Sequence, residues 1–151
     1  MPGPEIWGPP VWIFFHTLAE KINDNYFIKM KMPVLNIIKL IAKNLPCPKC
    51  SKEASIFLEK MNANNIRTKQ ELINYIYMFH NYVNKKNNKP LFNSQKIGVY
   101  KSLNVYKVFI NFTRVFHTRG NMQLLTESFQ RTLAIKSVRK WLIENRAFLL
   151  K

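Results

Sequence analysis

The sequence predicts an all-α protein, and two observations support this prediction. Apolar residues recur at spacings of three and four over most of the 151 residues, which is the pattern of one helical face. No segment shows the sustained apolar–polar alternation of a strand, and no Asn-Gly hairpin turn occurs. The composition, with 47% hydrophobic and 21% charged residues, is that of one globular domain rather than of a disordered or fibrous chain.

Residues 11–61 are expected to form three helices. The core face of the first, over about 11–30, consists of Val11, Phe15, Leu18 and Ile22. Trp12 and His16 lie on the neighbouring face and are candidates for the wall of a site. Pro33 opens the second helix, which ends at Pro46. The third begins after Pro46, so that Cys47-Pro48-Lys49-Cys50 lies at its N-terminus.

The rest of the chain is expected to add further helices. Thr68 and Glu71 have the spacing of a capping box, which predicts the start of a fourth helix that runs to about residue 85. Pro90 closes the basic loop that follows, and a short fifth helix is expected from about Ser94 to Leu103. Two more helices are expected, over about 105–120, where Gly120 ends the pattern, and over about 129–142.

The CxxC segment is the strongest chemical signal. A thiolate is the reactive form of cysteine, and a helix N-terminus and the neighbouring Lys49 both favour that anion. Two cysteines at this spacing can close and reopen a small disulfide, as dithiol–disulfide exchange requires. We expect Cys47 to be the more exposed of the two, because Cys50 continues the apolar face of the third helix.

Other interpretations of the CxxC are open at this point. A structural zinc site needs four ligands, and His16, His80 and His117 are not at ligand spacing, so we predict no metal. A thioredoxin-like enzyme would place its CxxC after a strand, and none is predicted. Two unreactive cysteines near a helix start remain the plain structural alternative.

Three motifs in sequence order then carry a resemblance. They are Trp7-Gly8 with Trp12 and His16, then Pro46-Cys47-Pro48-Lys49-Cys50, then His80-Asn81-Tyr82-Val83-Asn84 with Lys89-Pro90. Over about residues 5–100 the chain resembles the Erv/ALR family of FAD-linked sulfhydryl oxidases, and most of all the minimal versions of large DNA viruses. The resemblance implies a four-helix bundle with a short fifth helix that holds FAD, over residues 1–100. Residues 101–151 would be a basic helical extension, packed on this domain or at a dimer interface.

The resemblance also implies roles for individual residues. Cys47 would meet the substrate, and Cys50 would lie against the flavin. The residues implied to bind the cofactor are Gly8, Trp12, His16, His80, Asn81, Val83, Asn84, Lys86, Lys89 and Tyr100. Lys86 and Lys89 would face the pyrophosphate, although a solvated basic loop is the alternative for both. Without the motifs, Trp12 and His16 would be read as a core tryptophan and a satisfied histidine.

The implied activity is thiol oxidation, in which electrons from a protein dithiol pass through FAD to molecular oxygen and give hydrogen peroxide. The chain has no shuttle cysteine pair, so substrates would reach Cys47 directly or through a thioredoxin-like carrier. Family members usually form homodimers. The chain departs from the family pattern at Ser94, where many members have a further cysteine, and at Tyr100-Lys101, which replaces an Arg-Trp-like pair.

The charge balance leaves a second function class open. The formal net charge is +16, and residues 101–151 contain ten basic and two acidic residues. The alternative is a basic helical module that binds nucleic acid and has a structural CxxC. Because neither a signal peptide nor an apolar stretch of membrane-spanning length is recognised, we expect a soluble protein with no membrane partner. Its expected location is the cytoplasm, which would be that of the host for a viral protein, with the virion as a further site.

Overall fold

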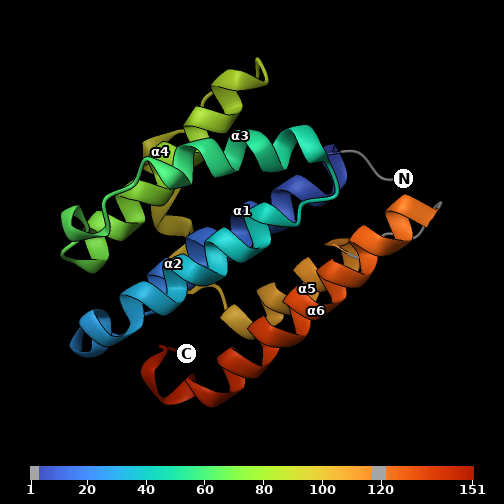
Figure 1. The fold of residues 1–151 in the computed structure, drawn as a ribbon. Helices are drawn as coiled ribbons and strands as arrows, with labels where there is room; N and C mark the ends of the chain where they lie inside the picture. The colour runs from blue at the N-terminus through green and yellow to red at the C-terminus, as the bar shows by residue number, and fades with distance from the viewer. Residues whose placement is uncertain (1–3, 117–121) are drawn as a thin grey trace.

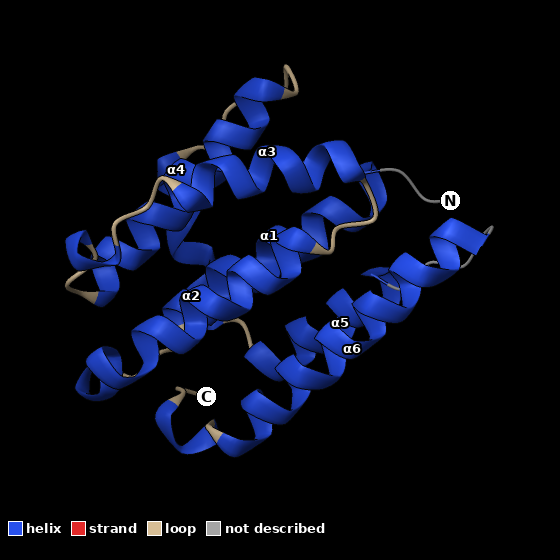
Figure 2. Ribbon diagram, viewed as in Figure 1, coloured by secondary structure: helices blue, strands red, loops and turns tan. Residues whose placement is uncertain are grey.

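Helices dominate the computed structural model of the chain, which describes residues 4–116 and 122–151 (Figure 2). Within these residues the β-structure is limited to one antiparallel bridge, between Ile22 and Leu149. The predicted all-α class is therefore confirmed. His117 and Gly120, which were considered as a metal ligand and as a helix end, lie outside the described residues.

The long helices are arranged in three rows of two (Figure 1). They are α1 (Pro4–Glu20) with α2 (Phe27–Lys43), α3 (Pro48–Glu59) with α4 (Lys69–Lys86), and α5 (Val105–Phe116) with α6 (Met122–Glu144). The α1–α2 pair lies in the middle, because α1 packs against both α4 and α5 while α2 packs against both α3 and α6. Helices α1–α4 form the expected bundle. Helices α5 and α6 form a hairpin that packs on the α1–α2 face of this bundle.

Three 3₁₀ helices lie between long helices of the described chain, and a fourth follows α6. They are η1 (Asp24–Tyr26), η2 (Ala63–Asn65), η3 (Ser94–Ser102) and η4 (Arg146–Phe148). The fifth helix predicted over 94–103 is η3, and it is a 3₁₀ helix that begins where the Asn93 side chain accepts a hydrogen bond from the N–H of Gln95 at 2.9 Å. The predicted N-cap at Thr68 is also present, because Thr68 Oγ1 accepts from the N–H of Glu71 at 3.1 Å.

The prediction of one helix over 11–30 was wrong at both ends. Helix α1 begins earlier, at Pro4, and ends at Glu20, and a polar turn separates it from α2. The turn forms because the Asn23 side chain caps η1 by accepting from the N–H of Asn25 at 3.0 Å, as asparagine commonly does.

Pro33 lies inside α2 instead of opening it. A proline inside a helix removes one hydrogen bond and costs about 3 kcal/mol in an isolated helix. The two turns before it are kept because Phe27 and Met30 are buried in the core. Tertiary packing therefore outweighs the local proline signal at this position.

One hydrophobic core runs through all three pairs of helices. On the hairpin side Phe14 of α1 stacks on Phe112 of α5, with ring centroids 5.3 Å apart, and Phe112 contacts Phe116 at 4.6 Å. The hairpin therefore shares its core with α1. On the opposite side of α1, polar rings face α4, and the candidate site lies there.

Candidate active site

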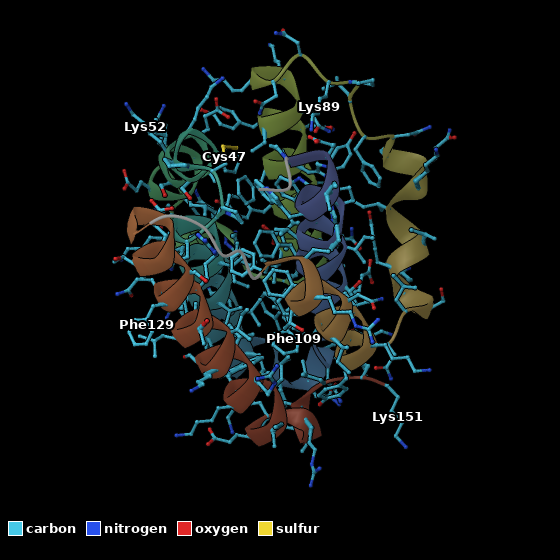
Figure 3. All side chains as sticks on the ribbon, turned by 90° about the vertical axis from the view of Figure 1, so that its right-hand side faces the viewer. Cys47, Lys52, Lys89, Phe109, Phe129 and Lys151 are labelled. Atoms are coloured by element: carbon cyan, nitrogen blue, oxygen red, sulfur yellow. A yellow bond between two sulfur atoms is a disulfide. The ribbon has the colours of Figure 1, made fainter. Side chains whose placement is uncertain are left out.

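The two cysteines are joined by a disulfide at the N-terminus of α3 (Figure 3). Cys47 is the N-cap residue, and its Sγ accepts a hydrogen bond from the N–H of Cys50 at 3.2 Å. Pro48 follows at a position whose missing N–H costs the helix nothing. When the disulfide opens, the unpaired N–H groups and the helix dipole stabilise a thiolate there. The local structure is therefore suited to thiol exchange.

Both cysteines are half-buried against the core, and the greater exposure of Cys47 stays a prediction. A cavity distinguishes them instead. Cys50 lines this cavity, whereas Cys47 is not among its lining residues. Cys50 is therefore the cysteine of the cavity wall, and Cys47 is the cysteine at the N-cap of α3.

The cavity has a volume of about 480 Å³ and lies where α1, α3 and α4 meet. This volume is within the range of small-molecule sites, and the walls are mostly apolar, as in such sites. The wall contains these residues from the predicted cofactor set: Gly8, Trp12, His80, Val83, Asn84, Lys89 and Tyr100. Residues from both ends of the predicted motif region are thus brought to one place.

His16 lies behind this wall. Its buried ring places Nε2 2.9 Å from Nδ1 of His80, so it reaches the cavity only through His80. Burial, reinforced by His80, lowers the pKa of His16 to about 3. Burial and the nearby Lys89 lower the pKa of His80 to about 4. Both rings are neutral at pH 7, and one donates the shared hydrogen bond that the other accepts.

Stacked rings hold the two histidines in place. Trp12 stacks on His80 with centroids 4.2 Å apart and planes at 11°, and Tyr100 stacks on His16 at 4.6 Å and 9°. Phe92 contacts the His80 ring at 5.1 Å. Because each ring is fixed by its neighbour, the wall presents a preformed aromatic surface.

Asn81, also predicted to bind the cofactor, is not among the residues that line the cavity. Its Oδ1 accepts from the N–H of Phe92 at 2.7 Å, and its Nδ2 donates to the Phe92 carbonyl at 3.3 Å. Adjacent residues of a helix point to different sides, so Asn81 cannot share the direction of His80. It holds the Phe92 backbone, and hence the ring beside His80.

The two lysines predicted to face a pyrophosphate differ in position. Lys86 is exposed, lies 5.7 Å from the Tyr82 ring centroid and is not part of the cavity wall. Asn88 follows the C-cap of α4 and adopts the left-handed conformation, with φ of 55°, which asparagine tolerates. The chain turns back, the N–H of Lys89 donates to the Asn84 carbonyl at 2.8 Å, and Lys89 joins the wall.

Trp7 and Asn87 are among the wall residues that were not predicted as site residues. Trp7 is 4% exposed, and its indole N–H has no hydrogen-bond partner among the described residues. Asn87 lines the wall and donates to the Val83 carbonyl at 2.8 Å and to Glu53 Oε2 at 3.2 Å. The available signal was helical spacing, since Trp7 precedes Val11 by four residues and Asn87 follows Val83 by four.

The described part of the chain contains neither a cluster of metal ligands nor a membrane-spanning helix. Residues 4–116 and 122–151 contain no group of three or more His, Cys, Asp or Glu side chains close enough to hold a metal ion. Over the same residues, no helix is long and apolar enough to span a membrane.

Comparison with known proteins places this site in a family. The sequence pattern of the Erv1/Alr family matches residues 9–104, a segment that includes both cysteines and most of the cavity wall. No solved structure is significantly similar to the chain.

Three relatives illustrate the range. A protein of Invertebrate iridescent virus 3, whose name is that of an FAD-linked sulfhydryl oxidase, is 28% identical over 58% of this chain and 60% of its own length. The FAD-linked sulfhydryl oxidase of African swine fever virus is 31% identical over 56% and 71%. The mitochondrial FAD-linked sulfhydryl oxidase erv1 of Schizosaccharomyces pombe is 28% identical over 58% and 49%. The chain thus spans about half to seven tenths of these relatives, and it belongs to the Erv1/Alr family.

Proposed function

We propose that the chain is an FAD-dependent thiol oxidase that forms disulfide bonds in protein substrates. One observation carries the proposal: Cys50 of the disulfide lines the same cavity as the stacked pair of Trp12 and His80. A redox pair is thereby adjacent to a ligand-sized space with an aromatic wall. The relatives named FAD-linked sulfhydryl oxidases support the same proposal, because they match the chain over the region that builds the cavity.

The cysteines perform the exchange chemistry. A substrate thiolate attacks Sγ of Cys47, which forms a mixed disulfide and releases Cys50 as a thiolate. The second substrate thiolate attacks the substrate sulfur of the mixed disulfide, which releases Cys47 and leaves the substrate oxidised. Two electrons have then passed to the cysteine pair. FAD, when bound, supplies an acceptor for this electron pair and a route to oxygen, with hydrogen peroxide as the product.

The residues of the cavity fit such a cofactor. The buried N–H of Trp7 has no partner among the described residues, and an acceptor atom of a ligand would satisfy it. A Cβ atom added at Gly8 would meet nothing within 4 Å, so the wall leaves space there. Trp12 and His80 offer a stacking surface, and Lys89 supplies a positive charge for a phosphate.

The remaining parts of the proposal rest on the family. We infer that residues 1–100 are the oxidase domain and that 101–151 are an extension. The partners are a protein dithiol or a thioredoxin-like carrier, and a second copy of the chain in a homodimer. The proposed location is the cytoplasm. Sedimentation of the purified protein tests the dimer, and a single species at the monomer mass would exclude it.

Oxygen consumption tests the proposed function. FAD-loaded protein should consume oxygen in the presence of dithiothreitol and produce hydrogen peroxide in equal amount. Cys47→Ser and Cys50→Ser should each abolish this activity, while thermal melting shows that both variants fold. A protein that takes up no FAD, and whose affinity for nucleic acid falls steeply with salt in both variants, would favour the nucleic-acid alternative.

A further inference from the structure

We propose that the oxidase selects dithiol substrates whose cysteines are flanked by acidic residues, and that it does so through a rim of lysines around Cys47. The inference rests on the proposed thiol oxidase function and names the substrate class. The lysine rim consists of Lys43, Lys49, Lys52, Lys85, Lys86 and Lys89.

The first half of the rim surrounds the start of α3. Lys43 is the last residue of α2, four positions before Cys47. The Leu45 N–H donates to Ser51 Oγ at 3.1 Å, which holds the connecting segment against the first turns of α3. Lys52 lies on that same helix, and both lysines are exposed. Lys43 and Lys52 thus place two exposed cations on either side of the disulfide in the sequence.

The second half of the rim comes from the end of α4. Asn87 donates to Glu53 Oε2 at 3.2 Å, which ties this end to α3. Lys85 and Lys86 precede Asn87 and are exposed, and Lys89 follows it on the cavity wall. In Figure 3, Lys52, the sulfur of Cys47 and Lys89 lie toward one end of the molecule, and Lys151 lies toward the other.

The acidic side chains of this region do not cancel the rim. Glu53 is paired with Lys49 at 3.8 Å and accepts from Asn87, so it neutralises one lysine and leaves the others. Glu5 lines the cavity from α1, across from the helix that begins at Cys47. The surface that an incoming substrate meets at Cys47 is therefore predominantly cationic.

A cationic rim would act on two steps, the diffusional encounter with a substrate and the ionisation of its docked thiol. Acidic residues beside a cysteine raise its thiol pKa and reduce the thiolate that attacks a disulfide, and nearby lysines reverse this shift in the docked complex. The same charges steer an acidic partner during diffusion, and salt weakens that steering because the Debye length is only about 8 Å at 0.15 M. A neutral dithiol also ionises more readily beside the lysines, but it is not steered, because it has no net charge.

The test uses FAD-loaded full-length protein and three substrates. Two are synthetic dithiol peptides of one length, flanked either by glutamates or by lysines, and the third is dithiothreitol. At low salt we expect kcat/KM for the acidic peptide to exceed that for the basic peptide by about tenfold or more, the lower end of electrostatic steering effects. The ratio should approach one at high salt, while dithiothreitol oxidation stays nearly constant.

Matched variants separate the rim from the overall charge. Lys43→Glu with Lys52→Glu should remove most of the preference for the acidic peptide over the basic peptide. Lys107→Glu with Lys136→Glu, at exposed positions of the α5–α6 hairpin, changes the net charge equally and should keep the preference.

Two results would overturn the inference. The first is equal kcat/KM for the two peptides at low salt. The second is an equal loss of preference in both double variants, which would assign the effect to net charge rather than to the rim. Failure to oxidise dithiothreitol would instead contradict the proposed function, so the two failures are distinguishable.

Discussion

Helix α1 buries aromatic rings on two sides, and the two sides differ in chemistry. Toward α4 it places Trp12 on His80, with His16 hydrogen-bonded behind. Toward α5 it places Phe14 on Phe112. The α4 side therefore combines polar rings with a cavity, whereas the α5 side is part of the continuous apolar core.

The contrast shows the limit of helical spacing as a predictor of a binding site. Helical spacing predicts which residues of α1 are buried on each side, but not whether the space opposite is filled. On the α4 side small residues such as Gly8 and Ala54 line the wall and leave room. On the α5 side, phenylalanine side chains fill the space between the helices. We therefore expect substitutions on the α5 side to change stability, and substitutions at the cavity to change ligand binding.

The largest effect is expected from Phe112→Ala. Its side chain is fully buried, and removing a core phenylalanine costs about 3–5 kcal/mol of unfolding free energy. Urea denaturation measures this loss. Phe129→Ala on α6, where the side chain is 61% exposed, is the control and should change stability by less than about 0.5 kcal/mol. Equal small losses in both variants would mean that the hairpin is not packed on α1.

The next effect concerns a contact that joins the two sides. Lys21 is 4% exposed, and its ammonium donates to the carbonyls of Lys101 at 2.5 Å and Lys151 at 2.9 Å. Lys21→Met should lower the unfolding free energy by about 2–3 kcal/mol, since hydrogen bonds to charged groups are stronger than neutral ones. Lys21→Arg keeps the charge and should restore part of the loss. Unchanged melting of Lys21→Met would show that this contact contributes nothing.

A pH effect should come from the cavity side. The pKa of His16 is about 3 in the folded protein and about 6.5 when unfolded, so between these values the unfolded chain binds more protons. Stability is therefore complete above pH 6.5 and falls with pH, by about 2 kcal/mol at pH 5 for this residue alone. Urea denaturation at pH 7 and pH 5 measures it. His16→Gln should show a smaller pH difference, and a wild-type protein equally stable at both values would contradict the prediction.

The smallest effect separates binding from stability. Gly8→Ala should raise stability by about 0.5–1 kcal/mol, because alanine is the better residue inside a helix. The same methyl group enters the cavity and should weaken FAD binding, as a fluorescence titration would show. Gly98→Ala is the matched control, since its Cβ also meets no atom within 4 Å but Gly98 does not line the cavity. Equal FAD affinity in wild type, Gly8→Ala and Gly98→Ala would place FAD away from this wall.

Much of this arrangement follows from sequence patterns, and the exceptions have physical causes. Periodicity predicts the helices, and the Thr68 capping box predicts where α4 starts. The boundary between the first two helices was misplaced because burial of Phe27 and Met30 outweighs the effect of Pro33. Local rules describe one helix at a time, whereas tertiary packing determines where it ends.

For the candidate site, too, the sequence predicts the local features but not the tertiary contacts. The motifs identified the residues that gather near the disulfide, including Trp12 and His80. They did not distinguish wall residues from residues that support the wall, so Asn81 was expected in the cavity although its amide holds the Phe92 backbone. That distinction depends on side-chain direction and on partners distant in sequence, which a single sequence does not reveal.

The visible absorption spectrum of the purified protein shows whether the disulfide and the cavity form one oxidase site. We expect a flavin band that bleaches when dithiothreitol is added in air-free buffer and returns when oxygen is admitted. Cys50→Ser should shift the band, because Cys50 lines the cavity. A protein that shows no flavin band even after FAD is supplied would contradict the claim that the disulfide and the cavity form one oxidase site.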